Sequence, residues 1–149
     1  MAISKLAQRR MTKLIDFMDA LPRSAVGHFN MKAWIKHNGN HDHKFGKFIK
    51  PRDVLTCGTT ACALGWATAV PAFKNAGLRV LADRGFDSNQ QNLSEAQRFF
   101  DLDRPTAVLF FGYSDEAVCP EDTHPTRHVR TPKQWAKSAK KLLRQLSAE

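Results

Sequence analysis

One cysteine of this chain, Cys57, lies at a position where its side chain could act as a nucleophile. It precedes a predicted helix, and the dipole at a helix N-terminus favours a thiolate over a thiol. His124 and His128 are the candidate bases for such a thiol. The carboxylates that could orient these bases are Asp115, Glu121 and Asp122. The surrounding sequence matches no cysteine-protease pattern, so we interpret Cys57 as a packing cysteine and predict no catalytic residue, with a cysteine hydrolase as the alternative.

A second group of residues carries the side chains that zinc prefers. Cys119, His124 and His128 follow one another at spacings typical of a loop, and Cys57 would supply a fourth ligand. A separate histidine cluster comprises His37, His41 and His43. The spacing matches no common zinc module, and histidines in loops are mostly solvated. We therefore predict neither a metal site nor a cofactor, and keep Cys119, His124 and His128 as the candidate ligands.

The charge of the chain favours an acidic partner. Lys and Arg number 23 against 14 Asp and Glu, which gives a formal net charge of +9 and a pI near 9.8. In the last predicted helix, basic residues recur at spacings of four, three and four, opposite the apolar face. The residues that we predict to bind the partner are Lys133, Lys137, Lys140 and Arg144 of this stripe, with Lys44 and Lys47 upstream.

Other basic residues add to this charge without defining a motif. They are Arg9, Arg10, Lys13, Lys50 and Arg52. No nucleic-acid-binding motif is present, so the partner is either an acidic protein or nucleic acid bound without sequence preference. A lysine stripe is also typical of an ordinary solvated helix face, and that alternative stays open.

Residues 57–67, C-G-T-T-A-C-A-L-G-W-A, combine two cysteines, two glycines and a tryptophan. We predict a helix over 61–69 that Thr56 or Thr59 caps and that Pro71 ends. Gly65 would belong to a face of small residues that lets a second helix approach closely. Cys62 would lie in the same face, within the core.

This segment resembles a C-G-T-x-x-C-x-x-G-[WH]-A signature found in a family of small proteins from bacteria and their phages. The resemblance extends over about residues 29–146, and includes an upstream F-x-M-x-x-W element at 29–34. The family has no assigned function, so the resemblance implies a shared fold and a phage or bacterial setting. The chain departs from the pattern by a His- and Lys-rich spacer after Trp34 and by a basic N-terminal helix.

Apolar periodicity and capping residues predict helices in most of the remaining chain. The first is a basic amphipathic helix over 3–21, within an N-terminal segment 1–22 that Pro22 closes. A short helix would start at Asn30 and carry Met31, Trp34 and Ile35. Further helices would begin at Ser94 with Gln97, at Asp103 with Pro105, and at Thr131 with Pro132 and Gln134. Segments 37–56 and 112–130 are predicted loops, and 78–81 could form one short strand.

These patterns predict an all-α, single-domain fold of about six helices over residues 1–149. No apolar run reaches the ~18 residues that cross a bilayer, and the N-terminus lacks an apolar signal core. An odd count of three cysteines favours a reduced, cytoplasmic protein, in the host cytoplasm if a phage encodes it.

We therefore predict a small basic accessory protein that binds an acidic macromolecule, with binding favoured over catalysis. A virion or assembly component is a further alternative, and the sequence does not indicate an oligomeric state.

Overall fold

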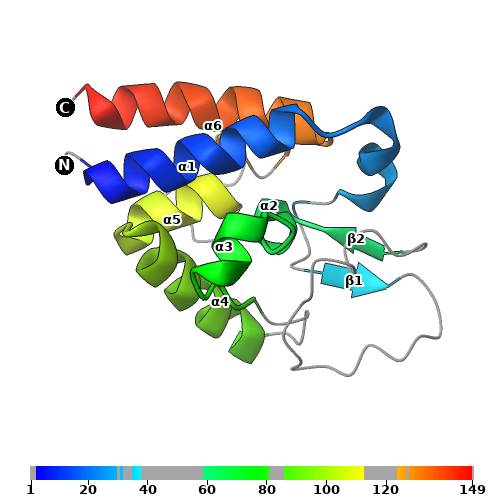
Figure 1. Ribbon diagram of the computed structural model, residues 1–149, viewed down its shortest axis with the longest axis horizontal. Coiled ribbons are helices and arrows are strands. Elements are labelled where there is room, and N and C mark those ends of the chain that lie inside the picture. The colour runs from blue at the N-terminus through cyan, green and yellow to red at the C-terminus, as the bar shows by residue number, and fades with distance from the viewer. Residues whose placement is uncertain are drawn as a thin grey trace.

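Two long helices lie side by side along one edge of the molecule (Figure 1). They are α1 (Lys5–Asp19) and α6 (Pro132–Ser147), which run antiparallel and leave both chain ends at the same end of the molecule. The computed structural model describes residues 3–29, 31, 35–37, 59–80, 86–112, 124–126 and 128–148.

Within the described residues, four further helices pack beneath this pair and make the fold mainly α-helical, as the sequence predicts. They are α2 (Ala63–Ala67), α3 (Pro71–Asn75), α4 (Phe86–Phe100) and α5 (Arg104–Phe111). Within the described ranges, no helix combines the length and the apolarity needed to cross a membrane.

A short antiparallel sheet stands where the sequence predicts helix. After the 3-10 helix η1 (Arg23–His28), strand β1 (Ile35–His37) pairs with β2 (Thr59–Ala61). The predictions that Ile35 is helical and that Thr59 caps a helix are therefore wrong. The physical reason is that β-branched residues suit a paired strand, and the ladder satisfies backbone N–H and C=O groups of both segments. Asn30 and Trp34 lie outside the described residues.

Helix α2 is shorter than predicted and is buried along its whole length. Cys62, which is buried, stands at its N-cap, and Gly65 and Trp66 lie within it. The helix ends before Pro71, as expected, but Pro71 also starts α3 at its first turn, where a missing N–H is tolerated.

A left-handed glycine turns the chain after α3. Gly77 has φ +94°, and its N–H donates to the carbonyl of Lys74 at 3.1 Å, while the N–H of Leu78 donates to Phe73 at 3.0 Å. This pair of bonds is a Schellman motif, with the buried Leu78 and Phe73 side chains supplying its apolar component. The predicted strand at 78–81 is not formed over 78–80, because this extended segment has no strand partner there.

Helix α4 begins earlier than its predicted cap. Ser94 and Gln97 lie inside the helix, which starts at Phe86, so the capping-box prediction at Ser94 is wrong. The sequence pattern S-x-x-Q records only a local preference, and continuous packing of the Leu93, Ala96 and Phe100 side chains in the core extends the helix through it.

The caps of α5 and α6 agree with the sequence. Asp103 accepts the N–H of Thr106 on its carboxylate at 2.9 Å, and Thr131 accepts the N–H of Gln134 on its hydroxyl at 3.1 Å. The Gln134 amide oxygen accepts the N–H of Arg130 at 2.9 Å, one residue before the position that a capping box uses.

A chain of aromatic rings links four helices through the core. Its members, which are all buried, are Phe73, Phe99, Phe100, Phe111 and Trp135. Neighbouring ring centroids lie 5.0–6.5 Å apart, from the edge-to-face pair Phe73–Phe99 to the stacked pair Phe111–Trp135. The Trp135 indole N–H donates to the carbonyl of Phe110 at 2.9 Å, which anchors α6 on α5.

Candidate functional site

The basic stripe of α6 is exposed along the helix. Its apolar face, which includes Trp135, Ala139 and Leu142, is buried, and the basic side chains lie opposite. The exposed basic residues are Lys133, Lys137, Lys140, Lys141 and Arg144. The helix contains no acidic residue. We call Lys137, Lys140, Lys141 and Arg144 the α6 stripe. Lys141 was missed from the sequence, although its spacing of four residues from Lys137 is the signal that identifies it.

Lys133 differs from the α6 stripe because it contacts α1. Its ammonium donates to the backbone carbonyl of Asp19 at 2.6 Å and lies 3.7 Å from the Asp19 carboxylate. A cation at this place satisfies a carbonyl at the C-terminal end of α1, where the helix dipole is negative. Lys133 is exposed, and its contact with Asp19 also joins α6 to α1.

Helix α1 carries a second row of exposed cations. Lys5, Arg9 and Lys13 follow one another at four-residue spacing on its outer face, and all three are exposed. Arg10 does not belong to this surface. Its guanidinium lies 4.1 Å from the ring centroid of Phe99 and donates to the Phe99 carbonyl, which holds α1 against the end of α4.

His124 is held by both of its ring nitrogens. Nδ1 accepts the backbone N–H of Thr126 at 3.3 Å, so the proton is on Nε2, which donates to the carbonyl of Val108 at 3.0 Å. The ring is 6% exposed. In this arrangement neither nitrogen offers a lone pair to a thiol or to a metal, and His124 fixes its segment to α5.

Of the other two candidate ligands and the candidate nucleophile, the structure describes only His128. His128 is exposed, while Cys57 and Cys119 lie outside the described ranges. Lys44 and Lys47, which we predict to bind the partner, also lie outside them, as do His41 and His43. Among the residues that are described, no three His, Cys, Asp or Glu side chains gather where they could hold a metal ion.

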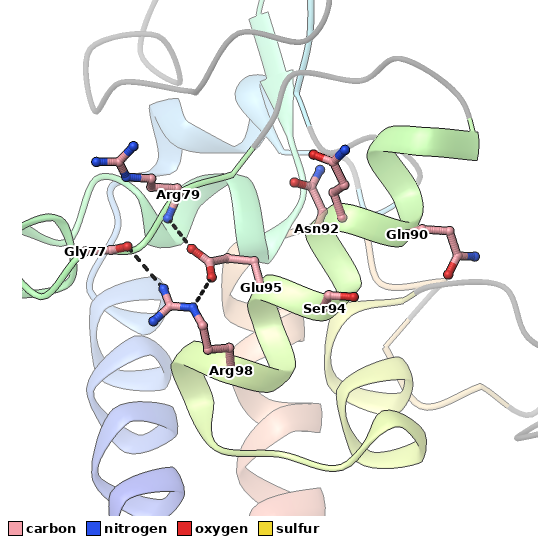
Figure 2. Close-up of a pocket in the computed structure, with 8 residues that line it drawn as sticks. Gly77, Arg79, Gln90, Asn92, Ser94, Glu95 and Arg98 are labelled. Carbon is pink, nitrogen blue, oxygen red and sulfur yellow. Dashed lines mark hydrogen bonds and ion pairs between the residues drawn. The ribbon is translucent and has the colours of Figure 1, made fainter.

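A pocket of about 580 Å³ lies between α4 and the turn after α3 (Figure 2). One of its lining residues, Asn92, is fully buried. The residues that line it are Gly77, Arg79, Gln90, Gln91, Asn92, Ser94, Glu95 and Arg98. This pocket could not be predicted from the sequence, because its lining comes from two separate segments, 77–79 and 90–98.

One carboxylate organises the charged side of the pocket. Glu95 accepts the backbone N–H of Arg79 at 2.8 Å and the Nε–H of Arg98 at 2.6 Å, and Arg98 reaches the carbonyl of Gly77 at 3.3 Å (Figure 2). The hydrogen bond that Arg98 donates to the Glu95 carboxylate, together with the negative charge of Glu95, raises the pKa of Arg98. These contacts join α4 to the turn after α3, and the Glu95 carboxylate is engaged in holding the two segments together. The lining residues include no cysteine or histidine.

Comparisons of the chain with protein-family models, with curated proteins and with solved structures found no match. The resemblance to the phage and bacterial family therefore stays a prediction. Within the described ranges, exposed cations recur along both α1 and α6.

Proposed function

We propose that this protein acts by binding an acidic macromolecule through the α6 stripe. The observation that carries this proposal is an exposed row of cations on a helix without a single acidic residue. Such a surface attracts a polyanion strongly at low ionic strength. In the phage or bacterial setting that the resemblance implies, the protein would be an accessory factor in the cytoplasm, working by association and without catalysis.

The α6 stripe works against the stability of its own helix, which supports a role in binding. Lys137 lies four, three and four residues from Lys133, Lys140 and Lys141. Like charges at these spacings destabilise a helix by about 0.2–0.5 kcal/mol per pair. A face that served solubility alone could alternate Glu and Lys and gain from the same spacings. Asp19 offsets part of the charge of Lys133, and no acidic residue of α6 offsets the others, an arrangement expected where a partner supplies the opposite charge.

Charge reversal tests the proposal directly. We would combine Lys137→Glu, Lys140→Glu and Arg144→Glu, and measure binding to poly-L-glutamate and to a 20-base-pair DNA duplex at low salt. At least one polyanion should bind the wild type and lose at least tenfold in affinity with the variant, whose melting temperature should stay close to that of the wild type because the changed residues are exposed.

A matched control separates the α6 stripe from net charge. Arg23→Glu, Lys74→Glu and Arg104→Glu change the charge equally at exposed sites outside α1 and α6. This control should retain most of the binding. Equal losses in the two variants would mean that general charge, not the α6 stripe, attracts the polyanion, and no binding of either polymer by the wild type would overturn the proposal.

A further inference from the structure

The contact between Lys133 and Asp19 fixes how the two rows of cations are aligned. Lys133 precedes Arg144 by eleven residues on α6, and Arg9 precedes Asp19 by ten residues on α1. At 1.5 Å per residue, both arginines lie about 15–17 Å from that contact along the antiparallel pair. Arg9 and Arg144 therefore stand at the same level, on helices whose axes are about 8–10 Å apart.

This alignment separates the charges along the helix pair. The acidic residues of α1, Asp16 and Asp19, lie at the end where Lys133 is tethered. Both chain ends lie at the other end of the helix pair (Figure 1). Toward that end, α1 and α6 expose only basic residues among their charged side chains. We call this surface the basic face. Its residues are Lys5, Arg9, Lys13, Lys137, Lys140, Lys141 and Arg144.

The composition of the basic face fits phosphates better than an acidic protein. Protein interfaces are enriched in aromatic residues and Met around a desolvated centre and are depleted in lysine. Within the described ranges, Val26 is the one large apolar side chain that is exposed, and it lies in η1, away from the basic face. Lysines act as point charges that displace counterions from phosphates, and they need no apolar surround.

The same composition distinguishes double from single strands. Proteins that hold single strands stack bases on exposed aromatic rings, and the described part of α1 and α6 exposes none. A duplex instead presents its charge on the outside and needs only cations to contact its backbone. We propose, building on the proposed function, that the basic face binds the phosphate backbone of a nucleic-acid duplex without reading its sequence.

Salt dependence tests whether both helices take part. Each cation that neutralises a duplex phosphate adds about 0.9 to the slope of log affinity against log salt. If most cations of the basic face engage, a 20-base-pair duplex should bind with a slope of about −5 to −6, measured by fluorescence anisotropy. Neutralising α1 with Lys5→Gln, Arg9→Gln and Lys13→Gln should reduce the magnitude of the slope by about 2–3. Lys137→Gln, Lys140→Gln and Arg144→Gln should do the same for α6.

Controls keep this inference separate from the proposed function. Arg23→Gln, Lys74→Gln and Arg104→Gln should leave the slope unchanged, and melting temperatures should show that every variant is folded. DNA and RNA duplexes of equal length identify the source of the phosphates, and a single strand and poly-L-glutamate complete the set of probes.

The outcomes then divide clearly. A wild-type slope in the α1 variant would overturn the two-helix basic face and leave binding through α6 intact. Tighter binding of the single strand, or binding of poly-L-glutamate without any duplex, would overturn the duplex assignment but keep an acidic partner. Failure of every polyanion to bind would overturn both proposals.

Discussion

His124 is a candidate base and metal ligand in the sequence, but in the structure it forms hydrogen bonds to backbone groups. Its position near other histidines, a cysteine and acidic residues favours a base or a ligand when the sequence is considered alone. The structure instead gives its two nitrogens an N–H of Thr126 and a carbonyl of Val108. These are backbone groups of an irregular segment and of α5, so the ring joins the two and satisfies the Thr126 N–H, which has no place in a helix or strand. Sequence cannot reveal this, because the decisive partners are backbone atoms.

Replacing His124 should therefore affect stability. We expect His124→Ala to lower the free energy of unfolding by about 1–3 kcal/mol, because the buried Thr126 N–H loses its acceptor and the Val108 carbonyl keeps only the N–H of Gly112. Urea denaturation measures this change. His128→Ala is the matched control, since His128 is exposed, and it should stay within about 0.5 kcal/mol of wild type. Equal effects of the two substitutions would contradict a structural role for the buried ring.

Asp101 is a second residue whose role only the backbone reveals. It has φ +54°, and the N–H of the next residue, Leu102, donates to the carbonyl of Gln97 at 3.0 Å, which closes α4. A left-handed backbone and a negative charge at a helix C-terminus are both unfavourable for aspartate.

Asp101→Gly should consequently raise the free energy of unfolding by about 0.5–1 kcal/mol, measured by urea denaturation. Asp101→Ala removes the charge but keeps a Cβ in the left-handed region, so it should be less stable than the glycine variant by about 1 kcal/mol. If the alanine variant were as stable as the glycine variant, backbone strain would not be the cause.

At the scale of elements, prediction succeeded where a local pattern defines the element. α1 forms where its apolar periodicity predicts a helix, and α5 and α6 form where periodicity and the predicted caps Asp103 and Thr131 coincide. It failed at Thr59–Ala61, whose strand partner Ile35–His37 is distant in the chain. A local window contains no information about such a partner, and the same small residues suit both a helix and a tight strand-to-helix junction.

The repulsion within α6 leads to a prediction about the helix itself. Lys137→Glu converts contacts with Lys133, Lys140 and Lys141 from repulsive to attractive, so the free energy of unfolding should rise by about 0.5–1.5 kcal/mol at low salt. The same variant should bind polyanions more weakly, which is the trade-off expected where charge serves a partner.

Thermal denaturation at two salt concentrations checks this prediction. The gain should shrink strongly in 1 M salt, where the Debye length is about 3 Å. Lys137→Gln removes the repulsion without adding attraction, so its gain should be about half as large. A stability gain that persists in high salt would point to helix propensity and not to charge.

At the scale of the whole molecule, the sequence identifies which helix faces are basic, but it does not show which of these faces lie next to each other. The α6 stripe follows from periodicity, whereas its alignment with Lys5, Arg9 and Lys13 depends on the antiparallel packing of α1 on α6. Arg10, which is next to Arg9 in the chain, is removed from the surface by its contact with Phe99. Counting charges in the sequence therefore overestimates the number of surface cations on α1. It also does not show that the cations of α1 and α6 are aligned, because both facts depend on the tertiary structure.

Binding at this surface should stabilise the whole fold in a salt-dependent way. A ligand that binds only the folded state at a free concentration 100-fold above its dissociation constant adds about 2.7 kcal/mol. For a chain of this length, that corresponds to a rise in melting temperature of about 5–10 °C. We expect this rise on adding a 20-base-pair duplex at low salt, measured by scanning fluorimetry, and its loss at 0.5 M salt, where the counterion contribution to binding is small.

The Lys137→Glu, Lys140→Glu and Arg144→Glu variant should show little rise at either salt concentration. A rise of equal size in that variant would mean that the duplex contacts another part of the chain.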